Sequence, residues 1–136
     1  MNGQMNTQRL ALLLDDNLMS AMRVQAQLQR MDFRVQTARE LPAPISETSQ
    51  NEQAANEQAA NAMPQLVIIN LGSRGLNGAA LVGICRERFP ASRVVGFCGH
   101  LEADIRRAAK AAGIDQILTN EQALSELLRS LAKTTP

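Results

Sequence analysis

The sequence predicts an α/β fold in which helices cover a parallel sheet. Five short apolar runs recur along the chain, and helix-like segments lie between them, which is the pattern of an alternating strand and helix order. The length of 136 residues suffices for one hydrophobic core and is short for two domains. We therefore expect a single domain over 1–136, with its folded core over 8–133.

The composition argues against general attraction to nucleic acid or membranes, against a membrane span and against a disulfide scaffold. The formal net charge is only +1, so no overall field attracts the protein to nucleic acid or to a membrane surface. No segment approaches the ~20 apolar residues of a membrane span. The two cysteines, Cys85 and Cys98, are too few for a disulfide scaffold and lie in apolar stretches. We expect both to be buried thiols in a reducing compartment, and we expect a cytoplasmic protein.

The first strand is expected over Arg9–Leu14, because a continuous Leu and Ala run is typical of a strand buried on both faces. Two acids and an Asn follow it and provide the cap of a helix that runs to about Arg30. Residues near helical spacing on that helix are Leu18, Ala21, Met22, Gln25 and Leu28. The second strand, Phe33–Thr37, alternates in polarity and is expected near a sheet edge.

The region from Ala38 to Met63 breaks the alternation of strands and helices. It contains the segment NEQAA at 51–55 and again at 56–60, a five-residue period that builds no continuous apolar stripe on a helix. Ala, Glu and Gln favour helix, so we expect a short solvated helix flanked by loop; a flexible loop is the alternative. The stretch 42–63 is therefore expected to be variable or flexible.

The strongest strand prediction is Gln65–Asn70, which is rich in β-branched residues and is expected at the centre of the sheet. A loop with three glycines then leads to a helix from about Ala79 to Arg88. The fourth strand is expected over Arg93–Cys98.

The remaining elements are two helices and a short strand. The helix Glu102–Ala112 is expected to turn Ile105, Ala108, Ala109 and Ala112 inward and to end at Gly113. The fifth strand is Gln116–Leu118, and a last helix is expected over Glu121–Lys133. One face of that helix carries Leu124, Leu127, Leu128 and Leu131.

Polar residues follow the predicted strands. Ligands of an open parallel sheet bind beyond the carboxyl ends of its strands, so we expect these residues to lie close to one another. They are Asp15, Asp16, Asn70, Cys98 and Asn120. Paired carboxylates suit Mg²⁺, which accepts one or two carboxylates plus water. The alternative is that Asp16 only caps a helix and that Asp15 is its solvated neighbour.

The order of these elements and several short motifs resemble the receiver domain of two-component response regulators, over nearly the whole chain. The matching segments are LLLDDN at 12–17, PQLVIINL at 64–71, LNG at 76–78, FCGH at 97–100 and AAGIDQILTN at 111–120. The resemblance implies a CheY-like, three-layer, doubly wound (βα)5 fold. Its five-stranded parallel sheet would have the flavodoxin-like order 2-1-3-4-5.

In that family, a histidine kinase supplies a phosphoryl group to an aspartate at the end of the third strand, on a bound Mg²⁺. The resemblance matches the family's acidic pair to Asp15 and Asp16, but it matches the phosphoacceptor to Asn70, whose neutral amide forms no ordinary acyl phosphate. The positions that sense and relay the phosphoryl group are also changed. The hydroxyl position is Cys98, the lysine position is Asn120 and the aromatic switch position is Ile117.

The resemblance therefore implies an atypical, phosphorylation-independent pseudo-receiver, a signal-transduction module that is not an enzyme and acts by protein–protein interaction. No cofactor is required, and any Mg²⁺ at Asp15 and Asp16 is expected to bind weakly. Two alternatives are a conventional phosphorelay receiver with a displaced acceptor and the N-terminal module of a DNA-binding transcriptional regulator.

The family commonly makes partner and dimer contacts through the face of helix four, strand five and helix five. The candidate interface residues on that face are Arg106, Arg107, Lys110 and Arg129. We expect a protein partner or a homodimer there; an ordinary solvated surface is the alternative. A second basic group surrounds the third helix and consists of Arg74, Arg86, Arg88 and Arg93. Direct nucleic-acid binding is not expected, because aromatic stacking residues and a recognition helix are lacking.

Overall fold

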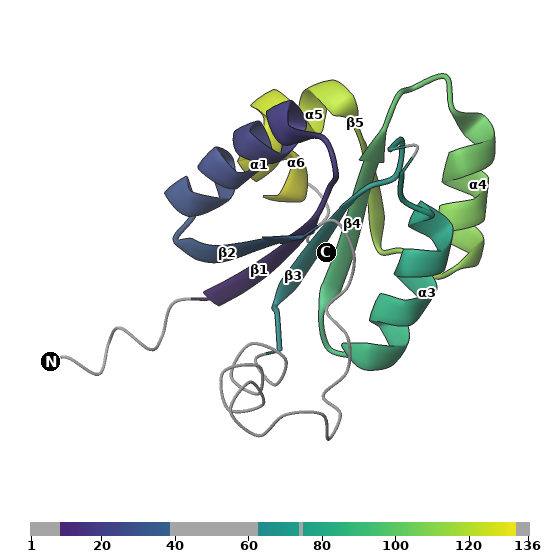
Figure 1. Ribbon diagram of the computed structural model, residues 1–136, viewed down its shortest axis with the longest axis horizontal. Helices are drawn as coiled ribbons and strands as arrows, with labels where there is room; N and C mark the ends of the chain where they lie inside the picture. The colour runs from purple at the N-terminus through teal and green to yellow at the C-terminus, as the bar shows by residue number, and fades with distance from the viewer. Residues whose placement is uncertain (1–8, 39–62, 74, 133–136) are drawn as a thin grey trace, which may run out of the picture.

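The computed structural model describes residues 9–38, 63–73 and 75–132. The strands are β1 (Arg9–Leu14), β2 (Phe33–Ala38), β3 (Leu66–Asn70), β4 (Arg93–Cys98) and β5 (Gln116–Thr119). The helices are α1 (Leu18–Arg30), α3 (Gly78–Arg88), α4 (Ala103–Ala111), α5 (Asn120–Ser125) and α6 (Leu127–Ala132). All strand pairs are parallel and the order is β2-β1-β3-β4-β5 (Figure 1), which confirms the predicted α/β fold, its strand order and the central position of β3.

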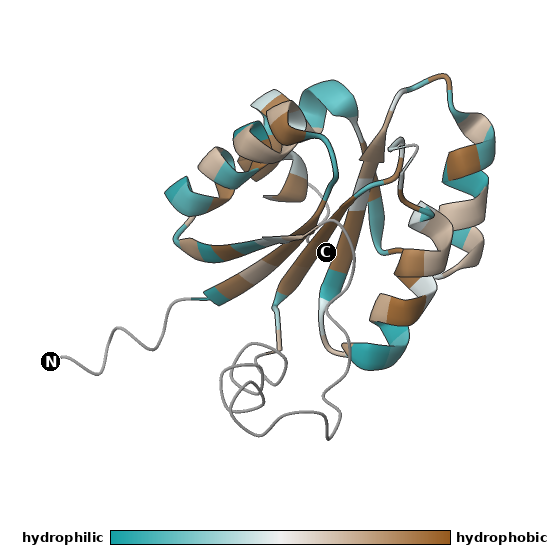
Figure 2. Ribbon diagram, viewed as in Figure 1, coloured by the Kyte–Doolittle hydropathy of each residue, from teal (hydrophilic) through white to brown (hydrophobic). Residues whose placement is uncertain are grey.

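The helices lie in two layers, one on each face of the sheet (Figure 1). The core beneath α1, α5 and α6 includes Leu13 and Ile68, whereas the core beneath α3 and α4 includes Leu14 and Ile69. Neighbouring residues of one strand thus enter opposite cores, as the pleat requires. Because both faces are covered, the central strands read as continuous apolar runs (Figure 2).

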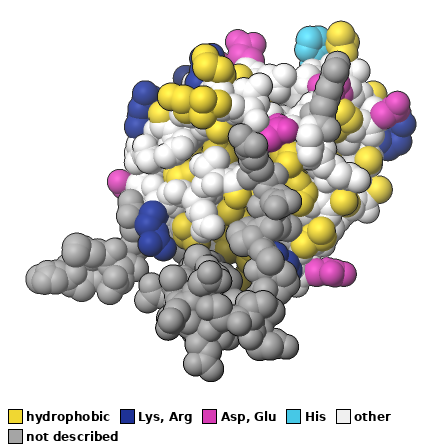
Figure 3. Space-filling model, viewed as in Figure 1, with side chains coloured by type: hydrophobic (Ala, Val, Ile, Leu, Met, Phe, Trp, Pro, Cys, Tyr) yellow, Lys and Arg dark blue, Asp and Glu magenta, His cyan; other side chains and the backbone are white. Residues whose placement is uncertain are grey.

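The prediction for α1 is correct in part. The helix buries Ala21, Val24 and Leu28, whereas Leu18 and Met22 are 72% and 57% exposed. Ala21 and Leu28 belong to both the predicted and the buried set, and Val24 is buried where Leu18 and Met22 were expected. The buried stripe is therefore rotated about the helix axis relative to the predicted one. Exposed hydrophobic side chains are consequently visible over α1 (Figure 3).

The prediction for α4 is correct in part. Ala109 is buried, and Ile105 and Ala112 pack against the same core, but Ala108 is exposed. Gly113 follows the helix with φ of 99°, so it ends α4 as predicted, in a left-handed conformation that favours glycine.

The continuous last helix predicted over 121–133 is wrong, because the chain breaks between α5 and α6. In an unbroken helix the N–H of Leu127 would bond to the carbonyl of Ala123. Here the side-chain amide of Gln27 lies between them: its Nε2 donates to the Ala123 carbonyl at 2.7 Å, and its Oε1 accepts from Leu127 N at 2.8 Å. Because α6 is displaced, Leu128 is 62% exposed instead of lying on the buried face.

The helix or loop expected within 42–63 lies outside the described residues, apart from Met63, as does the predicted helix end at Lys133. Among the helices that the structure describes, none has the length and apolar character needed to cross a bilayer.

Candidate functional site at the strand ends

Asp15 and Asn70 meet at the carboxyl ends of β1 and β3. The two strands are adjacent and in register, with Leu14 opposite Ile69, so the residues that come next lie side by side. Asn70 Nδ2 donates a hydrogen bond of 2.9 Å to Asp15 Oδ1. The sequence-based expectation that these side chains converge therefore agrees with the geometry.

Asp15 is a buried carboxylate, only 3% exposed, and its hydrogen-bond donors are uncharged groups. Besides Asn70, its Oδ1 accepts from Asn17 N at 2.9 Å, and its Oδ2 accepts from Ser20 Oγ at 2.5 Å. A buried carboxylate needs several donors, and Asp15 receives three from the described part of the chain. Its alternative interpretation as a solvated neighbour is wrong.

Asn70 uses both ends of its amide. Its Nδ2 faces Asp15, and its Oδ1 accepts from Gly72 N at 3.1 Å. The amide therefore links the end of β1 to the turn after β3. The partners require this orientation, because only the NH₂ group can donate to a carboxylate and only the oxygen can accept from an N–H group.

Asp16 is exposed and contacts the loop between β3 and α3. Its Oδ1 accepts from the Ser73 hydroxyl. A Cβ at Gly75 would lie 2.0 Å from Asp16 Oδ2, so this carboxylate packs directly against the loop backbone. The helix N-cap is Asn17, whose Oδ1 accepts from Ser20 N at 3.1 Å, and not Asp16.

Within the described ranges, no group of three or more His, Cys, Asp or Glu side chains is arranged to hold a metal ion. Asp15 and Asp16 are the carboxylates available to Mg²⁺ at the ends of β1 and β3, and each already accepts a hydrogen bond from another residue. Weak Mg²⁺ binding by this pair stays a prediction.

Glu102 also belongs to the site, although it was not among the residues predicted to follow the strands. Its Oε2 accepts from Gly99 N at 2.9 Å. A Cβ at Gly72 would lie 3.2 Å from the same oxygen and 3.7 Å from Cys98 Cβ. The carboxylate thus covers the ends of β3 and β4. The sequence signal that could have identified Glu102 is its position at the N-cap of α4, three residues after Gly99.

Arg106 lies one helical turn after Glu102 and turns toward the same loop. Its Nη2 donates to the Gly99 carbonyl at 3.3 Å, and its Nε is buried without a hydrogen-bond partner among the described residues. Glu102 therefore accepts from the N–H of Gly99, and Arg106 donates to its carbonyl. Arg106, which the family resemblance suggested as an interface residue, therefore lies at the strand-end site.

Cys98 and Cys85 are free and buried, as predicted. Burial raises the pKa of the Cys98 thiol; the guanidinium of Arg106 lowers it, and the carboxylate of Glu102 raises it. Burial also raises the pKa of Cys85 to about 11, with a smaller opposite effect of Arg88. Both thiols are therefore protonated at neutral pH.

The other predicted pocket residues, Asn120 and Ile117, take no part in the hydrogen bonds of Asp15 and Asn70 among the described residues. Asn120 is exposed and begins α5, and among the described residues it makes no hydrogen bond to Asp15 or Asn70. Ile117 is half-buried and packs against the core on the α3 and α4 face.

The four basic residues expected on one interface lie in different places. Arg106 contacts Gly99, Arg107 is exposed and paired with Asp104 at 2.9 Å, and Lys110 is exposed on the same helix. Arg129 belongs to α6, which covers the opposite face of the sheet from α4. These residues therefore do not form one continuous basic surface.

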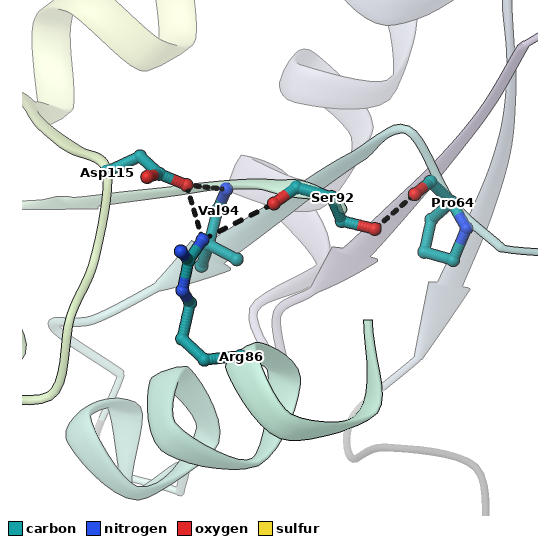
Figure 4. Close-up of polar contacts among 5 residues, drawn as sticks. All are labelled: Pro64, Arg86, Ser92, Val94 and Asp115. Carbon is teal, nitrogen blue, oxygen red and sulfur yellow. Dashed lines mark hydrogen bonds and ion pairs between the residues drawn. The ribbon is translucent and has the colours of Figure 1, made fainter. Parts of the chain in front are cut away.

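The second basic group is largely occupied by contacts at the amino end of the sheet. Arg86 donates to Asp115 at 2.9 Å and to the Ser92 carbonyl at 3.4 Å, and the same Asp115 oxygen accepts from Val94 N at 2.8 Å (Figure 4). Ser92 in turn donates to the Pro64 carbonyl. Arg93 bonds to Gln116 and to the Leu131 carbonyl. Arg88 stacks on the ring of Phe89, and Arg74 lies outside the described residues.

No protein-family model matches the sequence, and no curated protein sequence matches it. Solved structures do match. A response regulator from Thermotoga maritima is 21% identical, with a TM-score of 0.66, over 92% of this chain and 95% of that one. The chemotaxis protein CheY4 of Vibrio cholerae is 18% identical, with a TM-score of 0.69, over 95% of this chain and 100% of that one.

The signal receiver domain of an HD domain-containing protein from Pseudomonas fluorescens is 20% identical, with a TM-score of 0.69, over 93% of this chain and 85% of that one. These likenesses extend over almost the whole chain and establish that it has the fold of these receiver domains.

Proposed function

We propose that the chain is a receiver-like signalling module that acts through protein–protein contact, without accepting a phosphoryl group and without turnover. The observation that carries this proposal is the role of Asn70. The position corresponding to the phosphoacceptor holds an amide, and both ends of that amide are engaged in hydrogen bonds within the protein.

The chemistry of Asn70 supports the absence of phosphoryl transfer. A phosphoacceptor needs a lone pair on an anionic or activated atom. The nitrogen of Asn70 is an amide donor that faces Asp15, and its oxygen is neutral and accepts from Gly72 N. Neither atom is a usable nucleophile.

The charge at the site supports the same conclusion. An incoming phosphoryl group is an anion, and it would approach the ends of β3 and β4, where the Glu102 carboxylate already accepts from Gly99 N. Like charges repel each other, so the Glu102 carboxylate would oppose the approach of that anion. The nearby cation, Arg106, is already bonded to the Gly99 carbonyl.

A resident metal is not required for this function. Mg²⁺ at Asp15 would have to replace hydrogen bonds that Asn17, Ser20 and Asn70 already supply. The buried charge is stabilised by these donors without a cation. Partner binding is therefore expected to be the same with Mg²⁺ and with EDTA.

The test is exposure of the purified protein to acetyl phosphate and Mg²⁺, followed by intact-mass measurement. An ordinary receiver domain in the same tube serves as the positive control. We expect the control to gain the mass of one phosphoryl group and this chain to gain none. A stable phosphoryl adduct on this chain would overturn the proposal and would support a phosphorelay receiver with a displaced acceptor.

A further inference from the structure

Two adjoining grooves lie at the end of the sheet opposite Asp15 and Asn70: one between the C-terminal end of α1 and α6, the other between α6 and the first residues of β1, β2, β3 and β4. The first has a volume of about 420 Å³ and the second of about 390 Å³. Met31 and Leu128 line both grooves, so the two form one surface, here named the α1–α6 groove. None of the lining residues belongs to the strand-end site on which the proposed function rests.

The break between α5 and α6 shapes the groove. Gln27, which holds the break open, lines one part of it together with Leu127 and Leu128. The turn after α1 shapes the other part: Asp32 has φ of 67°, a left-handed conformation that sends the chain directly into β2. Met31 is half-buried and Leu128 is 62% exposed, so the middle of the groove presents apolar surface to solvent.

Positive charge surrounds this apolar surface. Arg30 and Arg129 are exposed at one part of the groove, and neither forms an ion pair in the described part of the chain. The other part is lined by Arg9, which is fixed by a 2.9 Å hydrogen bond to the Met31 carbonyl, and by Arg93.

Acidic side chains balance only part of this charge. Among the described residues, the lining contains four arginines against two acids, Asp32 and Glu126. Two of these arginines, Arg9 and Arg93, are also hydrogen-bonded within the protein. The groove is thus more basic than the chain as a whole, whose net charge is +1.

We propose that the α1–α6 groove docks an acidic, amphipathic segment of a partner protein. Its apolar side chains would cover Met31 and Leu128, and its carboxylates would face Arg30 and Arg129. Apolar anchors surrounded by complementary charge are what a helix-in-groove interface provides. This inference rests on the proposed function, since it names the surface through which a protein-contact module binds.

The test uses a defined probe and the full chain. The probe is a fluorescent amphipathic peptide with Leu at positions i, i+3, i+4 and i+7 and Glu on its polar face; a second peptide has Lys in place of Glu. Binding is followed by fluorescence polarisation and by NMR of ¹³C-labelled methionine methyl groups. We expect the acidic peptide to shift the Met31 signal and to leave those of Met19 and Met22, which are exposed on α1 away from the groove, unchanged.

Charge-reversal variants distinguish binding of the peptide in the groove from non-specific attraction to the protein's positive charge. The double variant Arg30→Glu, Arg129→Glu should weaken the acidic peptide by about tenfold or more. The matched control, Arg23→Glu, Arg34→Glu, changes the net charge equally at exposed positions outside the groove and should bind as the wild type does. If the reversal variant does not fold, the milder pair Arg30→Gln, Arg129→Gln replaces it, with a smaller expected loss.

Three results would overturn the inference: an unchanged Met31 signal, equal weakening by the control variant, or equal binding of the basic peptide. A dimer in size-exclusion chromatography that dissociates in the reversal variant would also overturn it, because a second copy would then cover the groove. None of these results changes the outcome of the acetyl phosphate experiment, so failure of the groove and failure of the proposed function are distinguishable.

Discussion

Asn70 Nδ2 lies 2.9 Å from Asp15 Oδ1, so the residue at the end of β3 donates a hydrogen bond to the buried acid at the end of β1. The relationship has a direction, because the amide can donate and a carboxylate at the same position could not. Asn70 therefore stabilises the charge on Asp15, and an acid in its place would oppose that charge.

The substitution Asn70→Asp should lower the free energy of unfolding at neutral pH. It replaces a hydrogen bond with two carboxylates in contact, and the expected loss is about 1–3 kcal/mol. Mg²⁺ should bind this variant more tightly than the wild type and restore part of the stability. Urea unfolding in EDTA and in Mg²⁺ measures both effects. Equal stability of the variant and wild type in EDTA, or unchanged Mg²⁺ affinity, would contradict the convergence of residues 15 and 70.

The substitution Gln27→Leu should destabilise the protein by about 1–3 kcal/mol, because the Ala123 carbonyl and the Leu127 N–H lose their shared partner. Urea unfolding checks the stability, and amide hydrogen exchange at Leu127 checks the local effect. The control is Gln29→Leu at an exposed position of the same helix, which should change little. Similar losses of stability in both variants would mean that the two hydrogen bonds of Gln27, here called the Gln27 bridge, do not maintain the break between α5 and α6.

Cys85 should make stability depend on alkaline pH. Its pKa in the folded protein is about 11, above the ordinary value of 9.0, so the folded state retains the proton longer than the unfolded state. The associated stability is present below pH 9 and is lost as the pH rises through 11, by up to about 2–3 kcal/mol. Urea unfolding across this range should show a steeper loss for the wild type than for Cys85→Ala. Parallel pH curves would rule out this role of the thiol.

Glu102→Ala should loosen the loop between β4 and α4. It removes the acceptor of the Gly99 N–H, so the amide exchange rate of Gly99 should rise by about tenfold. Glu102→Gln keeps an acceptor and should preserve most of the protection. The control, Glu121→Ala, changes an exposed acid in the first turn of α5. Unchanged exchange at Gly99 in Glu102→Ala would show that this carboxylate does not hold the loop.

Asp32→Gly should raise the free energy of unfolding by up to about 1 kcal/mol, because residue 32 has φ of 67° and glycine adopts this conformation without a steric penalty. Asp32→Ala should lower it by a similar amount, since alanine lacks the short polar side chain that makes aspartate tolerable there. Thermal or urea unfolding of the two variants gives the comparison. A stabilising alanine would contradict the assigned backbone conformation.

The sheet was predictable from sequence because its signals are local. The run from Leu66 to Ile69 needs cover on both faces, and parallel strands bring the residues that follow them to one edge. The convergence of Asp15 and Asn70 follows from those two facts.

The errors arose where two local patterns compete or where a distant side chain decides. On α1, Leu18 and Val24 belong to different apolar stripes, and only contact with the sheet chooses between them. Glu102 was missed because its role depends on the way α4 starts over Gly99. The last helix was predicted to be continuous because nothing within 121–133 shows that Gln27 interrupts it.

The Gln27 bridge also has a consequence for folding kinetics. It joins residues 100 positions apart, so it can form only after the chain has closed a loop that contains most of the sheet. A peptide that contains only α5 and α6 lacks Gln27, whose side chain bonds to the Ala123 carbonyl and the Leu127 N–H in the folded protein. Such a peptide would have nothing to keep α5 and α6 apart as two separate helices. The bend of the C-terminal helix is therefore expected to appear late in folding, once α1 has docked.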